Sequence, residues 1–270
     1  MQQLWPITLI TFKEGIRNRS IYGISLLASL MLVTNFIVSD MAPQGVGKVA
    51  TDIALSAVSF SGLLLVLFVG INLMAKDLDR KTIYMVLAKP ISRSNYLLGK
   101  FFGILLLILT CLGILCSFAT LSLFLIKLAN PDHFQRFSWH LVILSFYFTT
   151  LMLVLVTALS FLFASFTSTS FLTFILTVVS YIIGMSLNDV MALVEAPHTV
   201  GIMVSPITVK VVRAAYYLFP NLSFFDIKVQ AAHGLNISAA YIGGITAYTI
   251  GYSAIVLILA CLIFSRKEFP

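Results

Sequence analysis

Residues 76–100 read KDLDRKTIYMVLAKPISRSNYLLGK, and this charged stretch lies between two long apolar runs. It holds eight of the 27 formally charged residues (17 basic, 10 acidic): Lys76, Asp77, Asp79, Arg80, Lys81, Lys89, Arg93 and Lys100. The chain of 270 residues is 60% hydrophobic and 10% charged, whereas soluble domains carry about 25% charged residues. Its apolar runs are continuous rather than alternating, which predicts an all-α integral membrane protein.

Working outward from this stretch, we expect one membrane domain, residues 1–270, with six transmembrane helices, since about 20 apolar residues cross a hydrocarbon core of about 30 Å. The expected spans are residues 21–38, 53–75, 101–128, 141–163, 171–187 and 239–264. The segment 200–218 is semi-apolar but contains two cations, so we expect a surface or re-entrant helix there. Residues 1–20 are expected to form an amphipathic interfacial helix, because Leu9, Phe12 and Ile16 recur at helical spacing; a polar tail is the alternative.

Basic residues are distributed unevenly between the two sides that these spans define. If both termini are inside, the inner segments hold 11 Lys and Arg with 4 acidic residues, and the outer segments hold 6 of each. The positive-inside rule therefore predicts an N-in, C-in topology. The net charge of +7 is thus read as membrane topology, and no nucleic-acid partner is expected.

The charged stretch is expected to form a helix, a sharp turn and a second helix. Two acidic residues begin the first helix, where they favour the helix dipole, and Lys89-Pro90 ends it. Ser92 or Ser94 then caps a helix that continues into the third span. An apolar stripe runs along the first helix, made of Leu78, Thr82, Met85 and Val86 with Ile83 and Leu87 beside it. Such a stripe with a charged rim indicates a docking surface for another protein, and anchoring to anionic lipid is the alternative.

Motifs for catalysis or nucleotide binding are absent from the sequence. There is no GxxxxGK[ST], HExxH or GxSxG, so we expect no catalytic, cofactor or metal site, and no ATP bound by this chain itself. Four histidines are scattered over predicted outer segments, and we interpret them as ordinary loop residues, a copper or zinc site being the alternative: His133, His140, His198 and His233. No acidic residue lies in the middle of a span, which argues against a proton-coupled transporter. Asn35 and Asn72 are expected to make helix-packing hydrogen bonds.

The sixth expected span carries a small residue at every fourth position: Ala239, Gly243, Ala247 and Gly251. We call this row the small-residue stripe. It permits close helix approach, either within one subunit or at a dimer seam.

The charged stretch also resembles a segment of the permeases of type-2 ABC exporters, in which an acidic residue leads into (R/K)-(G/K)-T, then a proline motif and a final G-K. The matching positions are Asp77, Arg80, Thr82, Leu87, Pro90, Ile91, Ser92, Arg93, Gly99 and Lys100, with Lys81 where glycine is frequent. The K-E-x-x-R-N-R run from Lys13 to Arg19 and the R-K-E-F run from Arg266 to Phe269 are similar to the ends of such permeases. The subgroup it most resembles is associated with maturation of multi-copper enzymes.

This resemblance implies a coupling helix at the cytoplasmic surface between the second and third spans, and a six-span permease subunit of an ATP-driven exporter in the bacterial inner membrane. It implies that a second permease subunit pairs with the chain, and that a separate ATPase subunit binds ATP and Mg. The implied ATPase-docking residues are Asp77, Leu78, Asp79, Arg80, Lys81, Thr82, Met85, Val86, Leu87, Pro90 and Arg93. Arg80, Lys81 and Arg93 would be rim charges, and residues 165–170 a smaller second contact. An ATPase-independent transporter, an integral membrane enzyme and a non-transporting assembly factor are the alternatives.

Overall fold

The structure, a computed structural model, describes residues 4–41, 45–74, 92–134, 137–195 and 205–267. These parts of the chain are helical and contain no strand. The longer elements are α1 (Leu4–Ile16), α2 (Arg19–Asp40), α3 (Val46–Leu64), α6 (Arg93–Ala129), α7 (Trp139–Phe166), α8 (Ser170–Glu195), α10 (Pro206–Leu218) and α12 (Ala239–Arg266). The shorter ones are the π-helical η1 (Leu65–Gly70), the 3-10 turns η2 (Pro131–His133) and η3 (Ser223–Phe225), and α11 (Lys228–His233).

Six helical segments are long and apolar enough to cross a membrane, which confirms the predicted number. They are Arg19–Ser39, Val46–Met74, Arg93–Ala129, Trp139–Phe166, Ser170–Val194 and Ala239–Arg266. Each is longer than predicted, because a helix keeps satisfying its own backbone groups beyond the last apolar residue. The chain is therefore a multi-pass membrane protein.

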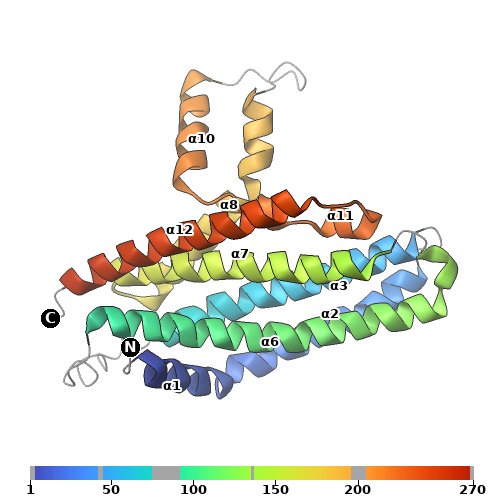
Figure 1. Cartoon of the computed structure of the whole chain (residues 1–270), viewed down its shortest axis with the longest axis horizontal. Coiled ribbons are helices and arrows are strands. Elements are labelled where there is room, and N and C mark those ends of the chain that lie inside the picture. The colour runs from blue at the N-terminus through green and yellow to red at the C-terminus, as the bar shows by residue number, and fades with distance from the viewer. Residues whose placement is uncertain (1–3, 42–44, 75–91, 135–136, 196–204, 268–270) are drawn as a thin grey trace.

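The second and fourth spans form the centre of the bundle. In their most apolar windows 67% of residues are buried, against 22% for α2 and 28% for α8 and α12. Small residues allow α3 to lie this deep: Ala50 and Ala54 are fully buried, and a methyl group added at Gly62 would lie 2.5 Å from Leu153 of α7. Helices α7 and α12 run side by side along the bundle (Figure 1).

Both chain ends lie at the same end of the bundle, which we call the terminal end (Figure 1). Helices α2, α6 and α8 begin there, and the second span, α7 and α12 end there. Helix α10 and the last part of α8 stand away from the bundle as an arm (Figure 1). The 13-residue α10 confirms that the segment around residues 200–218 contains a short helix rather than a span.

Helix α6 begins within the charged stretch, at Arg93. Ser92 is its N-cap, and the Ser92 hydroxyl accepts a hydrogen bond from the Asn95 backbone N–H at 3.3 Å. This cap was one of the two predicted from the sequence. It satisfies one of the backbone donors that every helix leaves unpaired at its start.

The predicted N-terminal helix is present as α1, and the face that packs on the bundle is not the predicted apolar row. The buried residues of α1 are Thr8, Thr11 and Gly15, whereas Leu9 and Phe12 of the predicted apolar row are half-buried and Ile16 is exposed. Small residues pack here because α1 lies directly against α6.

The contact between α1 and α6 is close enough to involve backbone atoms. The Thr8 hydroxyl donates to the Gly99 carbonyl at 3.2 Å. A methyl group built on Gly103 would lie 2.6 Å from Thr11 Cβ and 2.7 Å from the Thr8 carbonyl oxygen. Glycine at 103 is therefore required for α1 to dock at this depth.

Candidate functional site

Most of the predicted docking residues lie outside the described residues. These are Asp77, Leu78, Asp79, Arg80, Lys81, Thr82, Met85, Val86, Leu87 and Pro90. Arg93 is described, as are the two helix ends on either side of residues 75–91: the second span reaches Met74, and α6 starts at Arg93. We call these two helix ends the mounting points. Both mounting points belong to the terminal end of the bundle (Figure 1).

The first mounting point is held by a buried lysine. Lys100 of α6 is only 4% exposed, and its Nζ donates to the Leu73 carbonyl oxygen at 2.6 Å. The same ammonium lies 5.7 Å from the centre of the Tyr96 ring, within range of a cation–π interaction. A cation is favourable at this place because the last carbonyls of a helix lack intrahelical partners and carry partial negative charge.

The second mounting point is held by Arg93 itself. Its Nη1 donates to the Ser265 carbonyl at 3.1 Å and to the Lys267 carbonyl at 2.7 Å, both at the end of α12. One guanidinium nitrogen therefore caps the last turn of the sixth span. This geometry was not anticipated for a residue predicted as a rim charge.

Lys267 continues the connection to the turn between α7 and α8. Its Nζ donates to the Thr167 carbonyl at 2.5 Å, and the Thr167 hydroxyl hydrogen-bonds that of Thr173 on α8 at 2.7 Å. Burial lowers the pKa of the Lys267 ammonium below its ordinary value. Ser165 and Thr167 of the predicted second contact are buried, so this part of the turn faces the inside of the protein.

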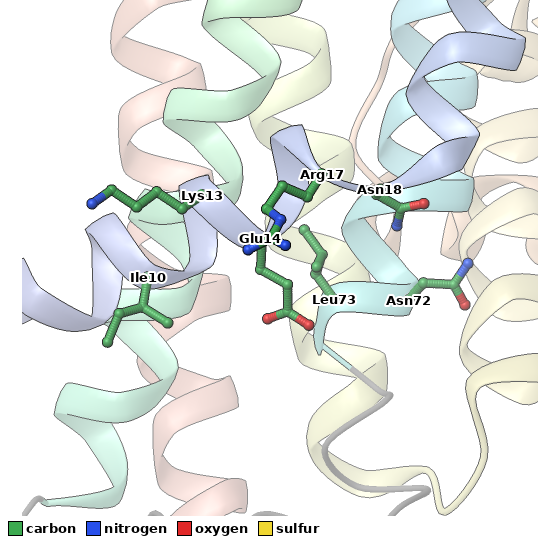
Figure 2. A pocket seen from close by; sticks show the side chains of 7 residues that line it. All are labelled: Ile10, Lys13, Glu14, Arg17, Asn18, Asn72 and Leu73. Carbon is green, nitrogen blue, oxygen red and sulfur yellow. The ribbon is translucent and has the colours of Figure 1, made fainter.

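An open cleft lies beside the first mounting point, between α1, the start of α2 and the end of the second span (Figure 2). Its volume is about 610 Å³, and it is lined by Ile10, Lys13, Glu14, Arg17, Asn18, Asn72 and Leu73. Figure 2 shows the Glu14 carboxylate reaching toward the end of the second span, while Lys13 extends away from it. The cleft therefore has a mixed charge, with two cations and one carboxylate on its wall.

The sequence also matches a known protein family over nearly its whole length. The sequence model of ABC-2 family transporter proteins matches residues 5–269, nearly the whole chain. The chain belongs to the ABC-2 family of transporter permeases. No curated protein matches it.

In this ABC-2 permease the small-residue stripe faces away from the rest of the chain. Ala239, Gly243, Ala247 and Gly251 are all exposed, and a methyl group added at either glycine would meet no atom within 4 Å. Packing within one subunit, one of the two interpretations of the stripe, is therefore not what the structure shows. Helix α12 instead packs inward through a different row that includes Thr249, Val256 and Ala260.

Two asparagines of the permease behave differently. Asn35 is fully buried and its Nδ2 donates to the Ala50 carbonyl of α3 at 3.1 Å, which confirms a helix-packing role. Asn72 donates to the Phe68 carbonyl of its own helix and lines the cleft, so the packing role predicted for it is wrong.

No group of three or more His, Cys, Asp or Glu residues that could hold a metal ion occurs in the described part of the permease. Of the four histidines, His198 lies outside the described residues, and the other three are at η2, the start of α7 and the end of α11. The contacts that sequence reasoning missed are those of Arg93, Lys100 and Lys267. Their one sequence signal is position: Arg93 and Lys100 belong to the charged stretch, and Lys267 follows the last predicted span by a few residues.

Proposed function

We propose that this permease is the membrane subunit of an ATP-driven exporter in a bacterial inner membrane, with its terminal end in the cytoplasm. A separate ATPase subunit binds ATP and Mg²⁺ and docks on the charged stretch through residues 77–90, whereas Arg93 is bound to the end of α12. Closure of the ATPase pair on ATP then pushes this stretch and opens a path toward the outside.

The proposal rests on the hydrogen bonds that hold the two mounting points to the bundle. Leu73, which precedes the stretch, and Arg93, which lies within it, are each hydrogen-bonded to the terminal end of the bundle. The excess of Lys and Arg on that side supports a cytoplasmic position. Membership of the ABC-2 family supports a partner that supplies the ATPase activity.

The cleft supports docking at the same place. Its wall offers Lys13 and Arg17 as cations and Glu14 as a carboxylate, which suits charged side chains of a soluble protein. It opens beside Leu73, where the second span leads into the charged stretch.

A second permease subunit completes the proposed complex. The exposed stripe on α12 favours this pairing, because small residues let two membrane helices approach closely. Two copies would then present two docking stretches to two ATPase subunits.

The test is purification of the tagged full-length permease from its own cells in mild detergent, followed by mass spectrometry and crosslinking. A cysteine-free permease carrying Met85→Cys should crosslink to a protein with an ATP-binding motif. The matched control is Asp132→Cys, which is exposed on η2 at the opposite end and should not crosslink to it. A permease that moves substrate without any ATPase, or crosslinks it equally from both positions, would contradict the proposal.

A further inference from the structure

Three cations at the terminal end share one arrangement. Each of the three spans that end there has a terminal carbonyl bound by a cation from another segment: Leu73 by Lys100, Thr167 by Lys267, and Ser265 with Lys267 by Arg93. The negative end of a helix dipole favours such cations, and the carbonyls have no partner within their own helix. The arrangement therefore recurs at every one of the spans that end at this surface.

These bonds connect into one continuous chain. Arg93 and Lys100 are seven residues apart, which places them on the same side of α6 two turns from each other. Lys100 holds the second span, Arg93 holds α12, and Lys267 carries the connection on to the turn before α8. Stacked rings of Tyr96 and Phe264, 6.3 Å apart and both buried, support the same junction of α6 with α12.

The second span has a distinct backbone just before this point. Residues Leu65–Gly70 are π-helical, and only one turn follows before the span reaches Met74. Short π-helical segments interrupt the regular hydrogen-bond ladder and are frequent at functional sites. The turn held by Lys100 is thus separated from the rest of α3 by a segment in which the helix can change its winding.

We propose that Arg93, Lys100 and Lys267 form a cationic clamp that makes the end of the second span, the start of α6, the end of α12 and the α7–α8 turn move as one unit. The three are positioning residues, and this role rests on the proposed function. A displacement of the charged stretch then reaches α12 and α8 through Arg93 and Lys267. In the second span, the π-helical η1 accommodates this displacement by changing its winding.

The first test uses the permease alone in lipid nanodiscs and measures hydrogen–deuterium exchange by mass spectrometry. Arg93→Gln should raise exchange on the order of 10-fold at the end of α12, since it removes charge-assisted hydrogen bonds. It should also raise exchange in the turn around Thr167, which is held by Lys267. Arg93→Lys, which keeps the charge and a donor, should restore most of the protection at both places. An effect confined to the end of α12 would overturn the clamp.

The second test uses the permease with its ATPase, trapped with ATP and vanadate, and spin labels on a background without native cysteines. Labels at positions 132 and 262 report movement of the α12 end relative to the opposite end of the bundle; both Asp132 and Leu262 are exposed. ATP should shift this distance in the wild type, and Arg93→Gln should abolish the shift while leaving the ATPase bound. An unchanged shift in Arg93→Gln would overturn the clamp. If the wild type binds no ATPase, the proposed function fails, and the exchange experiment still decides the clamp.

Discussion

Replacing Gly103 with alanine should push α1 off α6. The new methyl group would lie 2.6 Å from Thr11 Cβ and 2.7 Å from the Thr8 carbonyl oxygen, where ordinary contact begins at 3.4 Å. The second neighbour is a backbone atom, so no change of side-chain rotamer relieves the clash. Helix α1 must therefore move away by roughly 1 Å to regain contact distances.

That movement sets the expected magnitude. The hydrogen bond from Thr8 to the Gly99 carbonyl is already 3.2 Å long and would be lost, at about 1 kcal/mol. Overpacking costs about 1–3 kcal/mol, and alanine returns about 1 kcal/mol through its higher helix propensity. We expect Gly103→Ala to lower the free energy of unfolding by about 1–3 kcal/mol.

The same substitution ten residues further along α6 provides the control. Gly113 is exposed, and a methyl group there meets no atom within 4 Å, so Gly113→Ala should be neutral or stabilise by up to about 1 kcal/mol. Reversible unfolding in mixed detergent micelles, followed by far-ultraviolet circular dichroism, measures both variants. Equal stability of Gly103→Ala and Gly113→Ala would refute the close packing of α1 on α6.

Three further predictions concern single substitutions, and the first two have a matched control. Asn35→Leu should lower the free energy of unfolding by about 1–2 kcal/mol, because it breaks the bond to α3, whereas Asn72→Leu breaks only a bond within its own helix and should change it by less than about 0.5 kcal/mol. In a cysteine-free chain, Gly243→Cys should form a disulfide-linked dimer under mild oxidation, and Leu259→Cys, exposed elsewhere on α12, should not; gel electrophoresis without reductant distinguishes them. Lys100→Met should change the unfolding free energy by less than about 2 kcal/mol, because relief of burying an ammonium offsets the lost bond, yet it should raise hydrogen exchange at the end of the second span.

Hydropathy predicted the six spans because the bilayer imposes one requirement on all of them: a long run of apolar residues in a continuous helix. The N-cap of α6 could also be predicted, because the start of a helix depends on its immediate sequence neighbours. Ser92 precedes α6 and caps it as expected. The ends of the spans were placed too far inward, because hydropathy falls before the helix stops.

Features that depend on distant partners could not be predicted. Arg93 binds carbonyls that are 172 and 174 residues away in the sequence, and nothing near it distinguishes such a residue from a surface charge. The face of α1 that packs on the bundle could not be predicted for a related reason: its neighbour α6 presents Gly99 and Gly103, so close approach, rather than apolar character, decides which residues are buried. The exposure of the stripe on α12 likewise depends on where α7 lies.

The clamp changes how the positive side of this permease should be interpreted. Eleven basic residues were assigned to that side by topology, but position on the positive side does not make a charge available at the surface. Lys100, Arg93 and Lys267 direct hydrogen bonds at helix ends; Lys100 is almost completely buried, and Arg93 and Lys267 are half-buried. Because these three cations stabilise the framework, neutralising them should loosen that framework, whereas neutralising a residue that contacts the ATPase should weaken the complex and leave hydrogen exchange in the isolated permease unchanged. Arg93→Gln measured both ways therefore separates a residue that transmits movement from one that only attracts the partner.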